Sequence, residues 1–200
     1  YSYTLPVFSA LDEETRRRRT AVVLDSADFA RLDGPRSIPH DTFNVGYIGT
    51  VNPVKMHPDY VAMSAAVDVP GVRFVVYGSG DGLDRLRRQA AAIGAASRFD
   101  FHGFLRDIAS ALATFDVFGY PVHHCASDLV IQEAMFAGVP PLVFASGGCP
   151  FLVRHGETGL VVSSADEYSR AVEYLYTHPD ERRRLGANAA AYARAFLGAD

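Results

Sequence analysis

The sequence is poor in cysteine and contains a single lysine, and both scarcities limit what the chain can do. Its two cysteines, Cys125 and Cys149, are too few for a disulfide framework and lack the CxxC spacing of a zinc site. We therefore expect a reducing compartment, the cytoplasm. Every basic residue other than Lys55 is an arginine, so one ammonium group stands out as a candidate for a special role.

Several signals of localisation and of nucleic-acid binding are also absent. No apolar run reaches the roughly 20 residues of a membrane helix, and residues 1–15 lack the basic start and long apolar stretch of a secretory signal. The chain has 19 basic and 23 acidic residues, so no excess of positive charge predicts a nucleic-acid or membrane-surface partner. The run at residues 16–19 consists of arginines, but acids precede it, which is typical of a solvated helix. Because there is no initiator Met, we expect the chain to be the C-terminal part of a longer protein.

Strand-like and helical segments alternate along most of the chain. The predicted strands are residues 44–49, 72–77, 98–103, 116–121 and 140–145. The predicted helices between and after them are residues 57–67, 81–94, 105–115, 129–138, 165–177 and 179–197. This alternation predicts an α/β fold, a Rossmann-like parallel sheet with helices on both faces and helices at the C-terminus. We assign residues 44–200 to this domain and residues 1–43, with a short strand candidate at 21–25, to a connector or edge segment.

Ligands of open parallel sheets bind beyond the carboxyl ends of the strands, so the residues that follow each strand are site candidates. Gly49, Thr50 and Lys55 follow the first regular strand and precede a helix. A glycine turn, a lysine and a helix N-terminus together suit an anionic group, although an ordinary surface lysine is the alternative. The helix that starts after Ser127 or Asp128 offers a second N-terminus of the same kind.

The segment Gly78-Ser79-Gly80-Asp81-Gly82 follows the second strand and resembles a dinucleotide-binding fingerprint only in part. The GxGxxG pattern needs a glycine at position 83, where the chain has Leu83. Two interpretations remain open: a tight turn that brings backbone close to a ligand, or a plain turn from strand to helix. A Walker loop and a GxSxG nucleophile elbow are both absent.

Histidines follow the third and fourth strands. His102 suits either a binding role or a histidine at a strand end whose hydrogen bonds are satisfied. His123 and His124 are adjacent, and consecutive residues on an extended chain point in opposite directions, so a shared metal ion is disfavoured.

The helix at residues 129–138 carries one acid on a largely apolar surface. A carboxylate on a buried helix is costly unless it is paired or touches a ligand, so Glu133 is a site candidate. Gly138 is placed where a helix end favours a left-handed residue, and Pro140 blocks continuation of the helix.

These segments occur in a recognisable order: GT followed by Lys55, then VVYGSG, FHGF, EAMFAGVP, GGCP and GETGLVV. The order resembles the C-terminal, donor-binding domain of the family 4 (group 1) glycosyltransferases, which are retaining enzymes of the GT-B fold. The resemblance implies a nucleotide-diphosphate sugar as donor, hexosyl transfer with retention to an unknown acceptor, and no metal or other cofactor. It also implies an N-terminal acceptor domain outside this chain and a cytoplasmic location, peripheral at the inner membrane through that domain.

The resemblance implies roles for individual residues. Lys55 matches the lysine that contacts the donor diphosphate, and Glu133 matches the second acid of a Glu–seven residues–Glu motif that contacts the ribose. His102 to Phe104 match a segment whose backbone reads the nucleobase, and Leu129 and Val130 match residues whose amides meet the phosphates. With Lys55 and Glu133 as catalytic residues, the expected substrate-binding residues are Gly49, Thr50, Gly78, Ser79, Gly80, His102, Gly103, Phe104, His124, Cys125, Asp128, Leu129 and Val130.

The chain departs from the family pattern at the first motif acid, which is Cys125, and at the usual arginine, which is Thr50. A third departure is Phe151, at a position where the family often has an acid. These differences keep a noncatalytic nucleotide-sugar-binding module as an alternative, together with an epimerase or phosphorylase of the same architecture. A dehydrogenase is the weakest alternative, because its fingerprint fails at Leu83. We expect the domain alone to bind a donor but to transfer little sugar.

Overall fold

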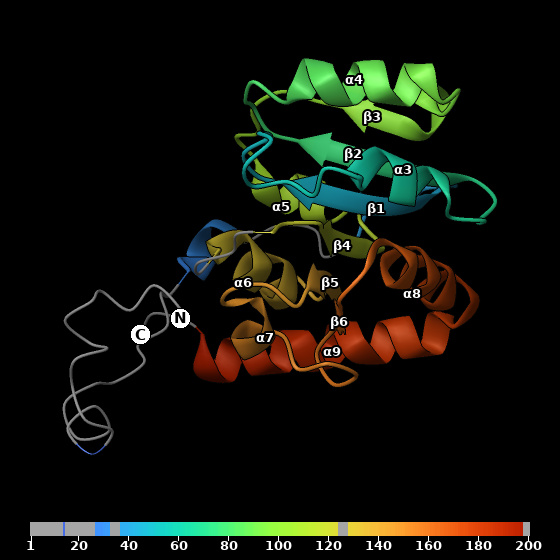
Figure 1. The fold of residues 1–200 in the computed structure, drawn as a ribbon. Helices are drawn as coiled ribbons and strands as arrows, with labels where there is room; N and C mark the ends of the chain where they lie inside the picture. Colours follow the sequence, from blue (N-terminus) through green and yellow to red (C-terminus); the bar gives the residue numbers. More distant parts are fainter. Residues whose placement is uncertain (1–13, 15–26, 33–36, 124–127, 198–200) are drawn as a thin grey trace.

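The structure is a computed structural model that describes residue 14 and residues 27–32, 37–123 and 128–197. Within this part of the chain, a six-stranded parallel sheet with the order β3-β2-β1-β4-β5-β6 forms the centre (Figure 1). The strands are β1 (Phe43–Ile48), β2 (Val72–Tyr77), β3 (Phe99–Phe101), β4 (Val117–Tyr120), β5 (Pro141–Phe144) and β6 (Leu160–Val162). The predicted parallel sheet is confirmed.

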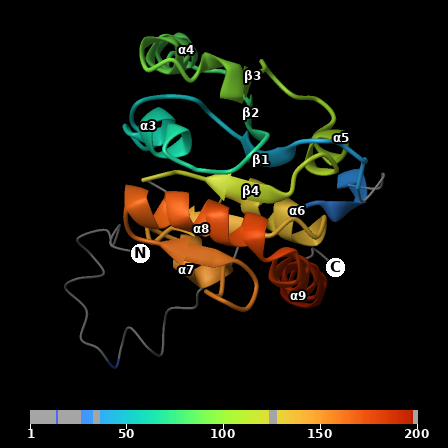
Figure 2. The same ribbon diagram turned by 90° about the vertical axis from the view of Figure 1, so that its right-hand side faces the viewer.

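Helices cover both faces of the sheet, as predicted (Figure 2). They are α3 (Tyr60–Ala65), α4 (Leu83–Ala92), α5 (Ile108–Leu112), α6 (Leu129–Phe136), α7 (Cys149–Leu152), α8 (Ala165–Thr177) and α9 (Pro179–Phe196), with two 3-10 helices, η1 (Phe29–Leu32) and η2 (Ala96–Arg98). The helix α3 packs against α4 and α8 on one face of the sheet. The last helix, α9, packs against both α8 and α6. None of the helices in the described part of the chain is long and apolar enough to cross a bilayer.

The strands β1, β4 and β5 are buried along their whole length, as expected for a parallel sheet with two covered faces. All six residues of β1 are buried, and β1 pairs in register with β2 from Phe43 opposite Val72 to Ile48 opposite Tyr77. A side chain at Gly46 would overlap the ring of Phe115, so glycine lets the segment after α5 pack directly on β1. These contacts fix the carboxyl end of β1, from which the candidate site begins.

The helix boundaries differ from those predicted, and local capping accounts for one difference. The predicted helix at 105–115 is α5, which begins only at Ile108, because the Asp107 side chain accepts the backbone N–H of Ser110 at 3.1 Å and caps the helix. The predicted helix at 57–67 is shorter too, and begins at Tyr60. Residues 104–107 therefore form a loop beyond β3, and this loop contributes to the candidate site.

Two short elements, β6 and α7, were not predicted, since their three and four residues are too brief to show a period. Part of the predicted connector packs onto the domain: Leu32 is buried, and Phe29 stacks on Phe136 of α6 with ring centroids 4.3 Å apart. The strand candidate at residues 21–25 and the arginine run at residues 16–19 lie outside the described residues.

The end of α6 confirms the predicted glycine stop. Gly138 has a φ of +82°, the left-handed conformation that glycine adopts without strain. A Cβ atom built on Gly186 of α9 would lie 2.2 Å from the carbonyl oxygen of Gly138, so the backbones of α9 and the α6 terminus touch. Glycine at position 186 thus lets α9 support the helix that carries Glu133.

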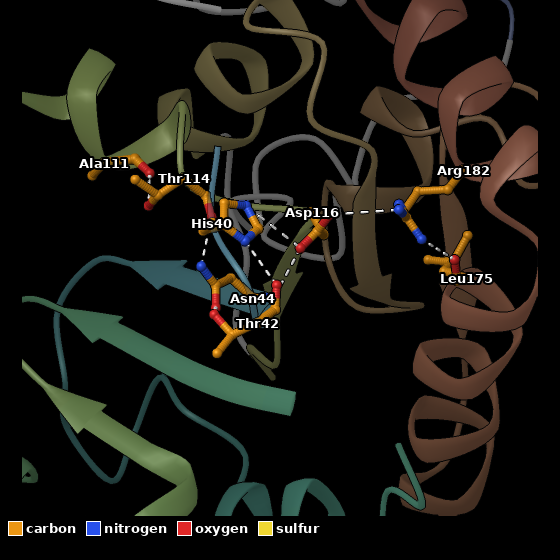
Figure 3. A network of polar contacts seen from close by, with 8 residues as sticks. All are labelled: His40, Thr42, Asn44, Ala111, Thr114, Asp116, Leu175 and Arg182. Carbon is orange, nitrogen blue, oxygen red and sulfur yellow. Dashed lines mark hydrogen bonds and ion pairs between the residues drawn. The ribbon is translucent and has the colours of Figure 1, made fainter. Parts of the chain in front are cut away.

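A polar network closes the amino end of the sheet, away from the candidate site (Figure 3). The Asp116 carboxylate accepts the backbone N–H of Asn44 at 2.9 Å and lies 3.5 Å from Arg182 and 3.7 Å from His40. Arg182 also donates to the Leu175 carbonyl at 2.6 Å. Burial lowers the pKa of Arg182, and the Asp116 charge opposes that change. The network ties β1 and β4 to the junction of α8 and α9.

Candidate functional site

A cavity of about 730 Å³ lies at the carboxyl ends of β1 and β4. These neighbouring strands are where the strand order reverses, because β2 and β3 follow on one side of β1 while β5 and β6 follow on the other side of β4. Such a switch point leaves a crevice between loops that diverge to opposite faces. The lining residues are Ile48, Gly49, Thr50, Lys55, Phe104, Leu105, Arg106, Asp107, Ile108, Tyr120, Asp128, Leu129, Val130 and Glu133.

The loop after β1 places Lys55 against the end of β4. The side chain of Asn52 accepts the backbone N–H of Lys55 at 2.7 Å, which closes a tight turn. Met56 then forms an antiparallel bridge with Val122, and the His123 N–H donates to the Lys55 carbonyl at 2.9 Å. Lys55 therefore sits on backbone that is hydrogen-bonded on both sides.

The Lys55 ammonium is paired with Asp128 inside the cavity. Its Nζ lies 2.8 Å from Asp128 Oδ1, and the two side chains are 26% and 18% exposed. Asp128 is the N-cap residue of α6, but its carboxylate makes no capping hydrogen bond to the helix.

Tyr47 lies near this pair. Burial, and secondarily the Asp128 charge, raise the pKa of the Tyr47 hydroxyl well above its ordinary value. The hydroxyl therefore stays protonated, and it donates to the Thr50 carbonyl at 2.8 Å.

The helix α6 supplies the opposite wall of the cavity. Its first two residues, Leu129 and Val130, line the cavity, so the start of the helix faces it. Glu133, one turn further along, also lines the cavity although its side chain is only 2% exposed. An ionised carboxylate in this position can only accept hydrogen bonds, and a ligand hydroxyl is a suitable donor.

The glycines after β2 allow two loops to touch. The Val51 N–H donates to the Ser79 carbonyl at 3.1 Å. A Cβ atom on Gly78 would lie 1.8 Å from the Gly49 carbonyl oxygen, and one on Gly80 would lie 2.1 Å from the Val51 carbonyl oxygen. Contact with the neighbouring loop therefore accounts for both glycines. Gly78 and Ser79 also line a smaller hollow of about 250 Å³. This hollow shares five lining residues with the main cavity: Ile48, Gly49, Thr50, Phe104 and Leu105.

The segment after β3 divides into residues inside and outside the cavity. Phe104 lines both hollows and is 78% exposed. His102 is not a lining residue, and its ring stacks on Tyr77 with centroids 4.5 Å apart. The Gly103 carbonyl accepts the Gly78 N–H at 3.0 Å, which links this segment to the loop after β2.

Two polar lining residues, Arg106 and Asp107, were missed from the sequence, because both were assigned to a helix. The signal that could have found them is an Asp directly before an apolar helical residue, Asp107 before Ile108, because Asp is a preferred N-cap residue. Arg106 adds a second positively charged side chain, after Lys55, to the lining of the cavity.

Two of the expected residues, His124 and Cys125, lie outside the described residues. The neighbouring His123 stacks on His57 with ring centroids 4.3 Å apart. Burial and the charge of His123 lower the pKa of His57, and the charge of Asp59 opposes this change.

Across residues 27–32, 37–123 and 128–197, no group of three His, Cys, Asp or Glu side chains could hold a metal ion.

The family profile of the glycosyl transferases group 1 matches residues 28–192. This match covers most of the chain, and the chain belongs to that family. A curated relative, the D-inositol 3-phosphate glycosyltransferase of Mycobacterium tuberculosis (strain ATCC 25618 / H37Rv), is 35% identical over 196 residues. That alignment covers 82% of this chain but only 39% of the relative, so the chain spans well under half the length of the curated relatives that it matches.

Solved structures show the same fold. HepE (Alr3699) from Anabaena, in complex with UDP, has a TM-score of 0.81 at 21% identity, with 92% of this chain and 55% of that chain covered. The sucrose-phosphate synthase of Thermosynechococcus elongatus has a TM-score of 0.77 at 25% identity, with 93% and 52% covered. The predicted Rossmann-like fold of one half of a GT-B glycosyltransferase is thus confirmed.

The close contact between the loops after β1 and β2 makes Gly80 a sensitive position. We predict that Gly80→Ala lowers the free energy of unfolding by about 1–3 kcal/mol, because the new methyl group overlaps the Val51 carbonyl oxygen. Gly103→Ala is the matched control, since a Cβ atom there meets nothing within 4 Å. Urea denaturation of both variants measures the difference. Equal stabilities would contradict the packing role of Gly80.

Proposed function

We propose that the cavity binds a nucleoside-diphosphate sugar and that this domain is the donor-binding half of a glycosyltransferase that retains anomeric configuration. The observation that carries the proposal is the convergence of Lys55, the start of α6 and Glu133 on one cavity at the switch point of the sheet. Membership of the group 1 family supports it. So do the structures of Anabaena HepE, which were solved in complex with UDP and with UDP-glucose.

The positive groups of the cavity suit the diphosphate. When the bond to the sugar breaks, negative charge develops on the leaving nucleoside diphosphate, and a positioned cation lowers the energy of that charge. The Lys55 ammonium supplies such a cation, and backbone amides at the start of α6 add the positive end of a helix dipole. With these groups in place the proposed reaction needs no divalent metal.

The remaining walls suit the nucleoside. We place the ribose near Glu133, whose carboxylate accepts hydrogen bonds from hydroxyl groups. The base lies in the smaller hollow, between the loops after β1 and β2 and the exposed ring of Phe104. Aromatic rings and bases attract each other by stacking, which is worth about 1–3 kcal/mol per base.

For the whole protein we propose a hexosyl-type transfer, as in glycosyltransferase family 4, to an acceptor held by another domain. We place this reaction in the cytoplasm. Because the chain spans 39% of its curated relative, we propose that the isolated domain binds the donor and transfers little sugar.

A noncatalytic nucleotide-sugar-binding module is the second candidate. The observation that favours it is the pairing of Lys55 with Asp128, because this ion pair neutralises the positive charge that a diphosphate needs. Thr50 adds no charge at the position where the family pattern has an arginine. Measurable donor binding without turnover by the full-length protein would favour this module over the enzyme.

The role of Lys55 predicts a selective loss of phosphate affinity. We expect Lys55→Ala to weaken UDP binding about 10- to 100-fold, because a hydrogen bond to a charged group contributes about 1.5–3 kcal/mol. Binding of uridine, which has no phosphate, should change little. Isothermal titration calorimetry measures both ligands. Arg88→Ala, which removes an equal charge from the exposed face of α4, is the control. Equal losses for UDP and uridine would contradict the assigned role.

The role of Glu133 predicts a change in ribose recognition. In the wild-type protein we expect UDP to bind about tenfold more tightly than 2′-deoxy-UDP, because the deoxy ligand lacks one hydroxyl partner. Glu133→Gln should remove this preference while circular dichroism shows an intact fold. Competition calorimetry with the two nucleotides measures it. An unchanged preference in the variant would show that Glu133 is a structural residue.

A further inference from the structure

The position of Asp128 is unusual for a site that binds an anion. Its carboxylate lies 2.8 Å from the Lys55 ammonium and directly precedes the first residue of α6. A lysine and a helix N-terminus are the two groups that attract a phosphate. The chain thus places a negative charge of its own where these two positive groups meet.

The hydrogen bonds of Asp128 show that Lys55 is its main partner. An aspartate at an N-cap position usually accepts a backbone N–H from the first turn of the helix, which stabilises the helix. Asp128 makes no such bond. Its Oδ1 contacts Lys55, and its Oδ2 is buried without a hydrogen-bond partner among the described residues. The two side chains keep 26% and 18% of their surface exposed, so water partly screens the pair and a charged ligand can compete with Asp128 for the ammonium.

The charges of the cavity wall oppose a diphosphate as it stands. Among the described residues, the cavity is lined by two basic side chains, Lys55 and Arg106, and three acidic ones, Asp107, Asp128 and Glu133. Like charges that contact the same ammonium lie close together, and their repulsion is stronger near a protein surface than in bulk water. A phosphate that contacts Lys55 therefore meets the Asp128 carboxylate as a competitor for the same ammonium.

We propose that Asp128 is an internal competitor of the donor phosphates and thereby determines how strongly the cavity binds phosphate charge. A phosphate binds Lys55 and the start of α6 only when the Asp128 carboxylate gives up its contact with Lys55. This inference rests on the proposed function of the same cavity. It assigns to Asp128 a role opposite to that of an ordinary ligand-binding residue, since its removal strengthens binding.

Calorimetric titration with inorganic pyrophosphate, UDP and uridine tests the proposal. We expect Asp128→Asn to bind pyrophosphate and UDP about tenfold more tightly than the wild type, and uridine equally well. The gain should vanish in the Lys55→Ala background, because the competition acts through Lys55. Asp128→Ser, which keeps an N-cap residue, gives a second measurement if the Asn variant is poorly folded.

Asp107→Asn is the matched control. It removes an equal charge from the same cavity, but Asp107 is bonded to Ser110 and not to Lys55. It should raise pyrophosphate affinity by less than about threefold. An equal gain in the two Asn variants, or no gain with Asp128→Asn, would overturn the proposal. Tighter pyrophosphate binding by Asp128→Asn, with UDP no better than pyrophosphate in any variant, would uphold the role of Asp128 and refute nucleotide binding.

Discussion

The candidate site depends on a short backbone pairing that crosses the switch point of the sheet. The Met56–Val122 bridge, with the hydrogen bond from His123 to Lys55, joins the loop after β1 to the end of β4. Without this pairing the two loops would diverge to opposite faces, as the strand order requires. The pairing carries Lys55 across the crevice to the start of α6, and so creates a cavity with charged groups on both walls.

Packing elsewhere in the domain holds the two walls of this cavity in place. The contact of Gly186 with Gly138 fixes the end of α6, and the network around Asp116 fixes the amino ends of β1 and β4. At the carboxyl end, glycine at positions 78 and 80 brings the loop after β2 onto the loop after β1. Glycines that look like a cofactor-binding pattern in the sequence thus act through close backbone contact within the domain.

The sequence predicts features that depend on local pattern and misses those that depend on tertiary contact. Buried strands, the Gly138 stop and an acid on the buried helix α6 are visible in the order of apolar residues and glycines. The start of α5 was misplaced because a cap, and not periodicity, decides it, and Arg106 was missed with it. No sequence pattern could reveal the pair of Lys55 and Asp128, which are 73 positions apart. The GETGLVV segment, specific as a motif, forms a turn and the edge strand β6 outside the main cavity.

We propose a site that combines groups attracting a nucleoside diphosphate, Lys55 and the start of α6, with one carboxylate, Asp128, that opposes it. The most direct test of the central claim is a thermal-shift panel on the wild-type domain with UDP, GDP, ADP, CDP and thymidine diphosphate. A ligand that binds only the folded state raises the melting temperature by mass action. We predict that one of the five nucleotides raises the melting temperature clearly more than the other four do. This result would establish a donor cavity with a defined nucleotide. No shift with any of the five at millimolar concentration would contradict nucleotide binding by this domain.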